Sequence, residues 1–211
     1  MIESVRQQFL ANHQKIYLTD YGTGGKRTKT IAEIAHKTIK SRKYAQLLFR
    51  LVNSNHSQQI LELGTSLGIS TMYLASANLK SNVVTIEGDS ALCDLAKKTF
   101  YSNNFQNITV IEGNLDFVLE DVVSKMDTLD FVFFDANHTQ VATLKYFSIC
   151  LAKINKNTIF VFDDIHWSAD MQRAWYQIAE HPAVRLSIDI FGMGIVWFDT
   201  DLMKQQYIVA F

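Results

Sequence analysis

The amino-acid sequence predicts an α/β protein with a doubly wound, mostly parallel sheet that is preceded by N-terminal helices. Two observations support this fold class. From residue 59 onward, short apolar runs alternate with segments that have helical length and helical spacing of apolar residues. Near the C-terminus, two apolar runs flank Gly192 and Gly194 closely enough to form an antiparallel hairpin. The alternation favours parallel strands joined by right-handed helical crossovers, and the hairpin adds antiparallel strands at one edge.

Five apolar runs are the expected parallel strands, and four of the segments between them are expected helices. The strands are predicted at residues 60–63, 83–86, 108–111, 129–134 and 158–162, and the helices at residues 70–78, 91–102, 115–123 and 144–151. The C-terminal hairpin is predicted from residues 184–191 and 195–198. Residues 207–211 form either one more strand or a segment that docks elsewhere, because periodicity does not distinguish the two.

Residues 1–56 are expected to form a helical cap with a mobile loop, and residues 57–211 one compact α/β domain. Ile31, Ile34 and Ala35 follow helical spacing, and a second apolar stripe runs through residues 44–52. Residues 20–29 are rich in glycine and charge, which is typical of a loop. The basic side chains of this loop are interpreted as solvated, and alternatively as a lid over an anionic substrate.

Composition and charge exclude several classes of function. The chain has 211 residues, 48% of them hydrophobic, and a formal net charge of -1, so it lacks the basic surface that nucleic-acid binding requires. No run approaches the roughly 18 apolar residues of a membrane span, and the N-terminus shows no apolar signal segment. Cys93 and Cys150 lack the spacing of a zinc site or a disulfide framework. We therefore expect a cytoplasmic protein that binds neither nucleic acid nor membrane.

A glycine-containing loop follows the first predicted strand. Gly64 and Gly68 stand between Glu62 and Ser70, at the carboxyl end of the strand, where open parallel sheets bind their ligands. Glycines at this place allow the backbone to approach a ligand closely before the next helix begins. The spacing differs from the G-x-G-x-x-G pattern of dinucleotide-binding proteins. Taken alone, the loop is equally well explained as a tight turn from strand to helix.

Two carboxylates near this loop favour a cationic ligand that contains adenosine. Glu62 would repel a pyrophosphate, but it suits the sulfonium and ammonium groups of S-adenosylmethionine (SAM). Glu87 ends the second predicted strand, where a carboxylate can accept hydrogen bonds from both ribose hydroxyls. The loop and the two carboxylates together indicate SAM as the cofactor.

In these segments the chain resembles the small-molecule O-methyltransferases, particularly the cation-dependent group that includes catechol and caffeoyl-coenzyme A O-methyltransferases. The resemblance covers roughly residues 40–198. It rests on Ala45 and Gln46, on the segment 61–70, on Glu87, and on the segments 130–136 and 160–164. The resemblance therefore spans the whole expected catalytic core.

The resemblance implies which residues hold the cofactor. The first loop would hold the methionine part of SAM, Glu87 would hold the ribose, and a residue near Asn114 or Leu115 would lie beside the adenine. The full expected cofactor-binding set is Glu62, Gly64, Ser66, Gly68, Ser70, Glu87, Gly88, Asn114, Leu115 and Asp135.

Three aspartates follow the fourth and fifth predicted strands. Asp135 ends the fourth strand, and Asp163 and Asp164 end the fifth, so neighbouring parallel strands would bring all three to one rim. Such oxygen ligands suit Mg²⁺ or another divalent cation. The resembling family binds its cation with an Asp and an Asp-Asn pair that map onto these positions, but here Asp164 replaces the Asn and adds a negative charge. A cation at Asp135, Asp163 and Asp164 is therefore one hypothesis, and a polar lining without metal is the other.

The expected catalytic residues are Asp135 and His138. The resembling family often carries a lysine three residues after the fourth-strand Asp, whereas this chain has His138 there. A histidine is available as a neutral base near pH 7, although it could equally cap the following helix. His166 and Trp167 follow the acidic pair and could line the acceptor pocket, but Trp167 is more simply interpreted as a core residue.

The sequence thus predicts an enzyme that transfers the methyl group of SAM to a small-molecule acceptor, at a hydroxyl oxygen. The alternatives are a cation-independent methyltransferase that acts on another atom, a cofactor-binding module without turnover, and a methylase of RNA or protein. The neutral charge argues against RNA, and no Asn-Pro-Pro-Tyr-like segment of amino-group methylases follows the fourth strand. The N-terminal helices make a homodimer a further hypothesis.

Overall fold

The computed structural model describes residues 1–19 and 26–211. The chain divides into two compact units: Met1–Gln58 with Gly64–Asn114 forms unit 1, and Gln59–Leu63 with Leu115–Phe211 forms unit 2. The domain boundary expected between residues 56 and 57 stays a prediction. None of the helices in the described residues is long and apolar enough to span a membrane.

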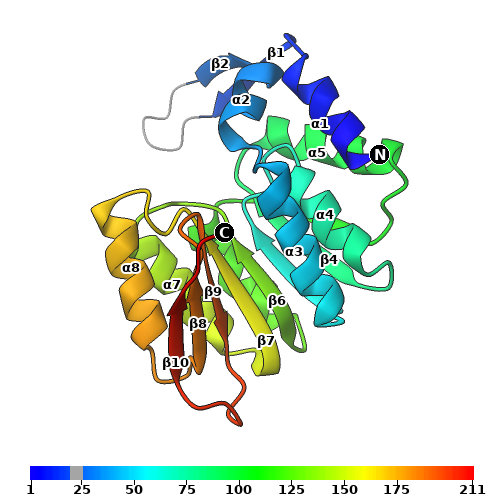
Figure 1. Cartoon of the computed structure of the whole chain (residues 1–211). Coiled ribbons are helices and arrows are strands. Elements are labelled where there is room, and N and C mark those ends of the chain that lie inside the picture. The colour runs from blue at the N-terminus through cyan, green and yellow to red at the C-terminus, as the bar shows by residue number, and fades with distance from the viewer. Residues whose placement is uncertain (20–25) are drawn as a thin grey trace. The chain divides into compact units, whose positions relative to one another are not determined.

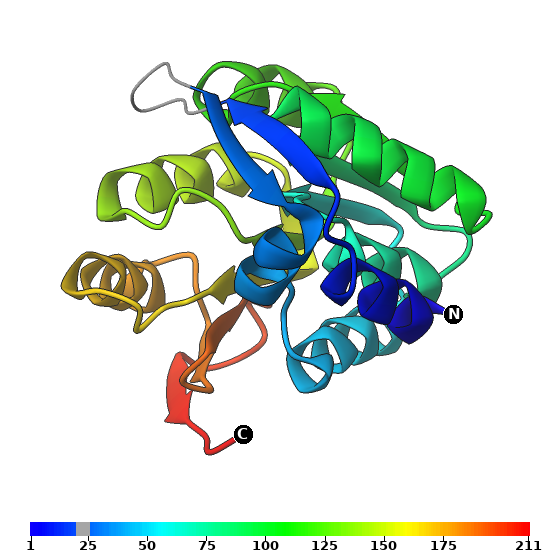
Figure 2. The same cartoon turned by 90° about the horizontal axis from the view of Figure 1, so that it is seen from above.

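Unit 1 contains the N-terminal segments and two parallel strands. Its elements are α1 (Ile2–Leu10), β1 (Lys15–Thr19), β2 (Lys26–Thr30), α2 (Ile31–Thr38), α3 (Arg42–Ser54), α4 (Ile69–Ala77), β4 (Asn82–Glu87), α5 (Ser90–Ser102) and β5 (Ile108–Glu112). The strands β4 and β5 pair in parallel, with Glu87 opposite Glu112. Figure 1 labels these elements, and Figure 2 shows the β1–β2 hairpin running beside α5, with which β1 is in contact.

The hairpin β1–β2 is an element that the sequence analysis missed. The two strands pair antiparallel, with Ile16 opposite Lys29 and Leu18 opposite Arg27. Residues 26–29 were expected within the loop, but they belong to β2, whereas residues 20–25 of that loop lie outside the described residues. The strand β2 contains no apolar residue, so it lacks the alternation that marks a strand in a sequence. Only β1 turns apolar side chains, Ile16 and Leu18, toward the core of unit 1.

The core of unit 1 is built from the apolar faces of its helices. The buried side chains include Val5 and Phe9 of α1, Ile31 and Ile34 of α2, and Met72 of α4. Met72 is fully buried, as expected for a residue that packs rather than binds a ligand. This packing gives the loop between β3 and α4 a firm support, because α4 begins directly after it.

Unit 2 contains most of the strands. Its elements are β3 (Gln59–Leu63), α6 (Leu115–Ser124), β6 (Leu129–Phe134), α7 (Gln140–Leu151), β7 (Ile154–Asp163), α8 (Ala169–Glu180), β8 (Leu186–Asp189), β9 (Met193–Trp197) and β10 (Gln205–Ile208). Within this unit the strand order is β10-β8-β9-β7-β6-β3. Figure 1 shows α7 and α8 side by side next to these strands, and α7 contacts both α6 and α8.

The strand directions in unit 2 agree with the predicted class. The pairs β3–β6, β6–β7 and β8–β10 are parallel, and β9 pairs antiparallel with both β7 and β8. The doubly wound, mostly parallel α/β fold with an antiparallel C-terminal hairpin is therefore confirmed. Of the two hypotheses for the last residues, the structure supports a strand, because Gln205–Ile208 extends the sheet beside β8.

The core of unit 2 is rich in aromatic rings. Phe134 and Phe162 stack with ring centroids 4.3 Å apart, and Phe160 meets Phe198 at 4.8 Å in a nearly perpendicular arrangement. Phe147 on α7 joins this group through the edges of Phe160 and Phe162. Buried aromatic rings contribute large apolar areas and well-defined geometry, so the ends of β6 and β7 have a rigid base.

Candidate active site

The loop from β3 to α4, here called the glycine loop (residues 64–68), adopts several left-handed backbone conformations. Gly64 has φ +99°, Ser66 +47° and Gly68 +74°. Glycine adopts such angles without steric cost, which explains the two glycines. Gly68 also has no room for a side chain, because an added Cβ would lie 2.4 Å from the ring of Phe100. The sequence therefore needs glycine here for conformation and for packing against α5.

Glu87, at the end of β4, holds the glycine loop through a hydrogen bond to its backbone. Its Oε2 accepts the backbone N–H of Ser66 at 2.8 Å, and its Oε1 accepts the backbone N–H of Asp89 at 2.9 Å. Burial raises the pKa of Glu87 above its ordinary value of 4.5, and the hydrogen bonds from Asp89 and Ser66 offset this only in part. The structure thus brings together two of the predicted cofactor-binding residues, Ser66 and Glu87.

Asp89 has a larger role than the sequence indicates. As expected of an acidic residue at a helix start, its Oδ1 accepts the N–H groups of Ala91 and Leu92 and caps α5. Its Oδ2 also accepts the N–H of Thr19 at 2.6 Å, which attaches the β1–β2 hairpin next to Glu87. No sequence signal predicts this contact, because it joins residues 70 positions apart.

The other predicted cofactor-binding residues lie on both units. In unit 1, Ser70 is partly buried in the first turn of α4, and Gly88 and Asn114 are partly buried at the ends of β4 and β5. In unit 2, Glu62 is fully buried within β3, and Leu115 is buried at the start of α6. Their contact with a cofactor stays a prediction.

Two carboxylates meet at the carboxyl ends of β6 and β7. These strands are parallel neighbours with Phe134 opposite Phe162, so the next residue on each, Asp135 and Asp163, is placed side by side. The N–H of Asp135 bonds to the carbonyl of Leu63 at 2.9 Å, which holds the first residue after β6 in line with the sheet. Asp163 is only 2% exposed.

A histidine joins these carboxylates and completes a candidate metal site. One ligand atom from each of Asp135, His138 and Asp163 lies within 4.8 Å of the others. The His138 Nε2 is 3.7 Å from Oδ1 of Asp135 and 3.9 Å from Oδ2 of Asp164. The structure therefore groups two of the three predicted metal ligands with His138, and it places Asp164, which has φ +54°, beside the histidine.

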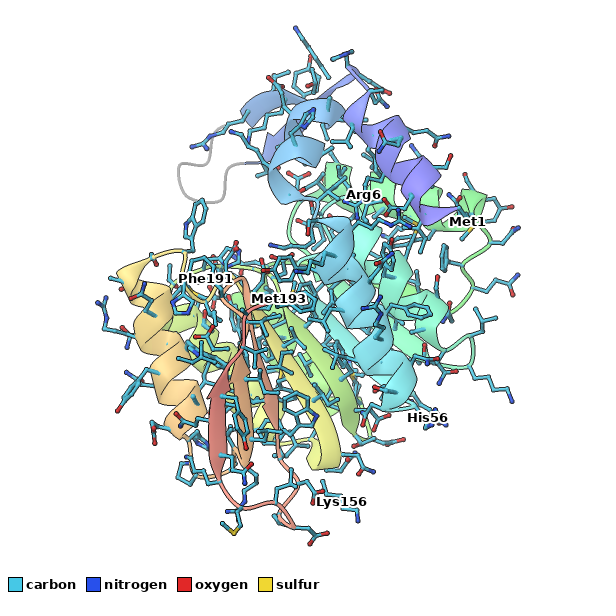
Figure 3. All side chains as sticks on the ribbon, in the orientation of Figure 1. Met1, Arg6, His56, Lys156, Phe191 and Met193 are labelled. Atoms are coloured by element: carbon cyan, nitrogen blue, oxygen red, sulfur yellow. The ribbon has the colours of Figure 1, made fainter. Side chains whose placement is uncertain are left out.

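The loops after β7 and β8 form an exposed aromatic surface. The His166 Nε2 lies 2.7 Å from Oδ2 of Asp189, and its ring stacks on Phe191 with centroids 5.3 Å apart. Phe191, labelled in Figure 3, is 76% exposed. Trp167 is also 76% exposed, so its interpretation as a core residue is wrong. The sequence does not reveal this, because a tryptophan after a strand fits a core and a pocket equally well.

Comparison with known families assigns a class to this geometry. A family described as "Methyltransferase domain" matches residues 61–165, which include the glycine loop, Glu87 and the Asp135–Asp163 pair. This chain contains a methyltransferase domain. The methyltransferase resemblance expected from the sequence is thereby confirmed, and so is the expectation that the protein is an enzyme of this class.

Solved structures support the same assignment. An O-methyltransferase from Bacillus cereus, solved in complex with SAH, is 25% identical to this methyltransferase and superposes with a TM-score of 0.65, covering 76% of this chain and 83% of that one. The O-methyltransferase TomG from Streptomyces achromogenes, solved with SAM, is 22% identical, with a TM-score of 0.67 and coverages of 76% and 82%. A methyltransferase from Geobacter sulfurreducens is 14% identical, with a TM-score of 0.68 and coverages of 94% and 89%. No curated protein gives a significant sequence match.

Proposed function

We propose that this methyltransferase transfers the methyl group of SAM to a hydroxyl oxygen of a small-molecule acceptor. The observation that carries the proposal is the pairing of Glu87 with the N–H of Ser66 in the glycine loop. It places an acidic side chain beside a loop of left-handed backbone, at the carboxyl end of a parallel strand, where nucleosides bind in such sheets. The similar O-methyltransferases solved with SAH and SAM support the same cofactor and reaction.

The residues of the glycine loop fit SAM. The Glu87 carboxylate accepts backbone N–H groups from Ser66, Asp89 and Gly88. A carboxylate has about four acceptor sites, so it can still accept from a ribose hydroxyl. A buried carboxylate attracts a ligand that carries a sulfonium and an ammonium group. The family resemblance also assigns Glu62 and Asp135 of unit 2 to cofactor binding. SAM supplies a methyl group on a positively charged sulfur.

The remaining requirements of the reaction fall on side chains of the chain itself. The acceptor oxygen forms a bond to the methyl carbon while the carbon–sulfur bond of SAM breaks. The electron pair of the broken carbon–sulfur bond stays on sulfur. The acceptor must therefore be aligned and must lose its hydroxyl proton. His138 is suited to receive this proton, because Asp135 at 3.7 Å stabilises the imidazolium that forms.

A divalent cation at Asp135, His138 and Asp163 is part of the proposal. The candidate ligands are two carboxylates and one imidazole within 4.8 Å of one another. This mixed set suits a divalent transition metal such as Mn²⁺ better than it suits Mg²⁺ or Ca²⁺, which prefer oxygen ligands throughout. A bound cation would lower the pKa of an acceptor hydroxyl. His138 would then serve as a ligand, and the proton would leave by another route, so the two roles of His138 exclude each other.

Methyl transfer is tested with SAM and a panel of phenols and catechols, with mass spectrometry of the products. We expect one or more acceptors to gain a single methyl group with the wild type, and Glu87→Ala to lose most of the turnover at low SAM concentration. Glu112→Ala is the matched control, since Glu112 ends the neighbouring strand but is exposed. Transfer to a ring carbon only would contradict O-methylation.

The metal hypothesis is tested by titrating chelator-treated protein with Mn²⁺ and by repeating the titration with three variants. If Asp135, His138 and Asp163 hold the ion, Asp163→Asn and His138→Gln weaken Mn²⁺ binding strongly, whereas Asp164→Ala has a small effect. The ligand set implied by the resemblance predicts the reverse for His138 and Asp164. Full methyl transfer in the presence of a chelator would instead support the cation-independent alternative.

The proposal includes a free small molecule as partner, with neither nucleic acid nor membrane, and a cytoplasmic location. The net charge of -1 supports the absence of nucleic-acid binding. Cys93 and Cys150 are free and buried, and burial raises the pKa of the Cys93 thiol to about 12, as suits a structural thiol in a reducing compartment. A homodimer is also proposed, and light scattering of the purified protein would test it.

A further inference from the structure

A buried arginine on the first helix ties three segments of unit 1 together. Arg6 is 7% exposed, and Figure 3 shows it projecting from α1 toward the start of α3. Its Nε donates to Oε1 of Glu3 at 3.0 Å, and its Nη1 donates to the carbonyl of Lys40 at 2.5 Å. The same Glu3 oxygen accepts the hydroxyl of Tyr73 on α4 at 2.8 Å. The Arg6 guanidinium therefore links α1 to the turn between α2 and α3, and Glu3 extends this link to α4.

The turn that Arg6 holds, residues 38–41, reaches the glycine loop. The hydroxyl oxygens of Thr38 and Ser66 lie 2.9 Å apart. Because Thr38 donates its own proton to the carbonyl of Ile34 at 3.1 Å, Ser66 is the donor in this pair. The N–H of Ser66 in turn bonds to Glu87. Hydrogen bonds and a short stretch of backbone thus connect Arg6 to the carboxylate at the end of β4.

Burying the Arg6 guanidinium costs desolvation free energy. The Nη2 of Arg6 is buried and has no hydrogen-bond partner among residues 1–19 and 26–211, and an apolar side chain of similar volume would avoid this desolvation. Glu3 compensates the charge. Burial raises the pKa of Glu3, but hydrogen bonds from Tyr73 and Arg6 and the charge of Arg6 outweigh it and lower the pKa overall. The arrangement is better explained by what the guanidinium holds than by packing.

We propose that Arg6 is a positioning residue for cofactor binding, which fixes the 38–41 turn, holds Thr38 against Ser66 and keeps the glycine loop in its binding conformation. The inference rests on the proposed function, because it takes the glycine loop as the SAM site. Ser66 has a left-handed φ of +47°, and a serine keeps such a conformation only when its surroundings fix it. The bond to Thr38 is one such restraint, and Arg6 secures it.

Two measurements on the full chain test this inference. Amide hydrogen exchange of residues 64–68 is followed without SAM, and SAM affinity is measured by calorimetry. Arg6→Met replaces the guanidinium with an apolar side chain, and Thr38→Val removes one hydroxyl from an exposed position. We expect both variants to raise exchange in the glycine loop and to weaken SAM binding about three- to tenfold, a scale typical of coupled contacts. The double variant should lose little more than the larger single loss.

Matched controls separate positioning from general destabilisation. Thr38→Ser keeps the hydroxyl and should restore exchange and affinity to wild-type values. Thr99→Val removes a hydroxyl that bonds to the carbonyl four residues earlier, in Leu95, as Thr38 does in α2, and no bond from Thr99 to the glycine loop occurs in the described residues. It should change neither measurement. If Arg6→Met fails to fold, Thr38→Val still decides the question.

The outcomes distinguish this inference from the proposed function. Normal SAM binding by the wild type, with unchanged loop exchange or unchanged affinity in both variants, overturns the role of Arg6 alone. Absence of SAM binding to well-folded wild type overturns the proposed function, and the positioning role with it. Increased exchange and weakened binding in both variants, with rescue by Thr38→Ser, is the result that we expect.

Discussion

At the level of single residues, the raised pKa of Glu87 lowers the folding stability of the protein near neutral pH. The Glu87 side chain is partly buried, and desolvation by burial raises its pKa in the folded protein above 4.5. A raised carboxyl pKa means that the folded state holds the proton more tightly than the unfolded state does. The contribution of Glu87 to folding stability therefore falls as the pH rises from 4.5 through the folded pKa. A site that binds a cationic ligand accounts for this cost.

The same shift predicts how cofactor binding depends on pH. Protonation of Glu87 removes its charge and one acceptor, so SAM affinity should fall as the pH is lowered from neutral through the raised pKa, by about tenfold per unit below it. Calorimetric titrations from about pH 7.5 down to the lowest pH at which the protein stays folded measure this slope. Glu87→Gln should bind SAM weakly at every pH with a much flatter profile. An identical slope in both proteins would show that another group controls the dependence.

Gly68 is a second residue where one added methyl group has a defined cost. A Cβ at this position would lie 2.4 Å from the ring of buried Phe100, in a backbone with φ +74°. We expect Gly68→Ala to lower the free energy of unfolding by about 1–3 kcal/mol, as overpacking does. Urea denaturation measures the change. Adding Phe100→Leu should recover part of the loss, and no recovery would attribute the whole effect to the backbone.

At the scale of elements, the junction of β2 and α2 depends on one capping box. The N–H of Thr30 donates to Oε2 of Glu33 at 2.6 Å, and the N–H of Glu33 donates to Oγ1 of Thr30 at 3.1 Å. Thr30→Ala should destabilise the protein by about 1 kcal/mol, while Thr30→Ser should preserve the cap. Thermal unfolding of both variants would show the difference. Equal losses in the two variants would mean that the cap hydroxyl is not the cause.

The elements that the sequence predicts share a physical property. Each strand from β3 to β7 contains a short, largely apolar run, and its bounds lie within about four residues of the predicted ones. The hairpin β1–β2 escapes prediction because β2 is made of lysine, arginine and threonine. Ile16 and Leu18 pack against a core that includes residues as far along the chain as Phe100, and no local pattern encodes such packing.

The candidate site was predictable where strand order decides it and unpredictable where loops do. Asp135 and Asp163 come together because they end neighbouring parallel strands. His138 enters the same group only because the loop turns back after Asn137, which has φ +53°. Likewise, the contact between Thr38 and Ser66 depends on a turn whose path is fixed by tertiary packing. Such features need the fold before they can be inferred.

At the level of the whole chain, the methyltransferase domain is preceded by an N-terminal segment that contacts it. The family match begins at residue 61, yet the contact of Thr38 with Ser66 ties the preceding segment to a predicted cofactor residue. The contact of Thr19 with Asp89 ties it to a residue whose N–H donates to Glu87. The methyltransferase from Geobacter sulfurreducens covers 94% of this chain, so its similarity extends over both parts. Experiments should therefore use the full chain. Removing the N-terminal segment should weaken SAM binding.

The most direct test of the central claim is calorimetric titration of chelator-treated, full-length protein with SAM, compared with Glu87→Ala. We expect saturable binding near micromolar affinity, weakened in Glu87→Ala by about 1.5 kcal/mol or more, the scale of lost hydrogen bonds to a charged group. Glu112→Ala should bind like the wild type. Absence of SAM binding to well-folded wild type, with and without added Mn²⁺, would contradict the account.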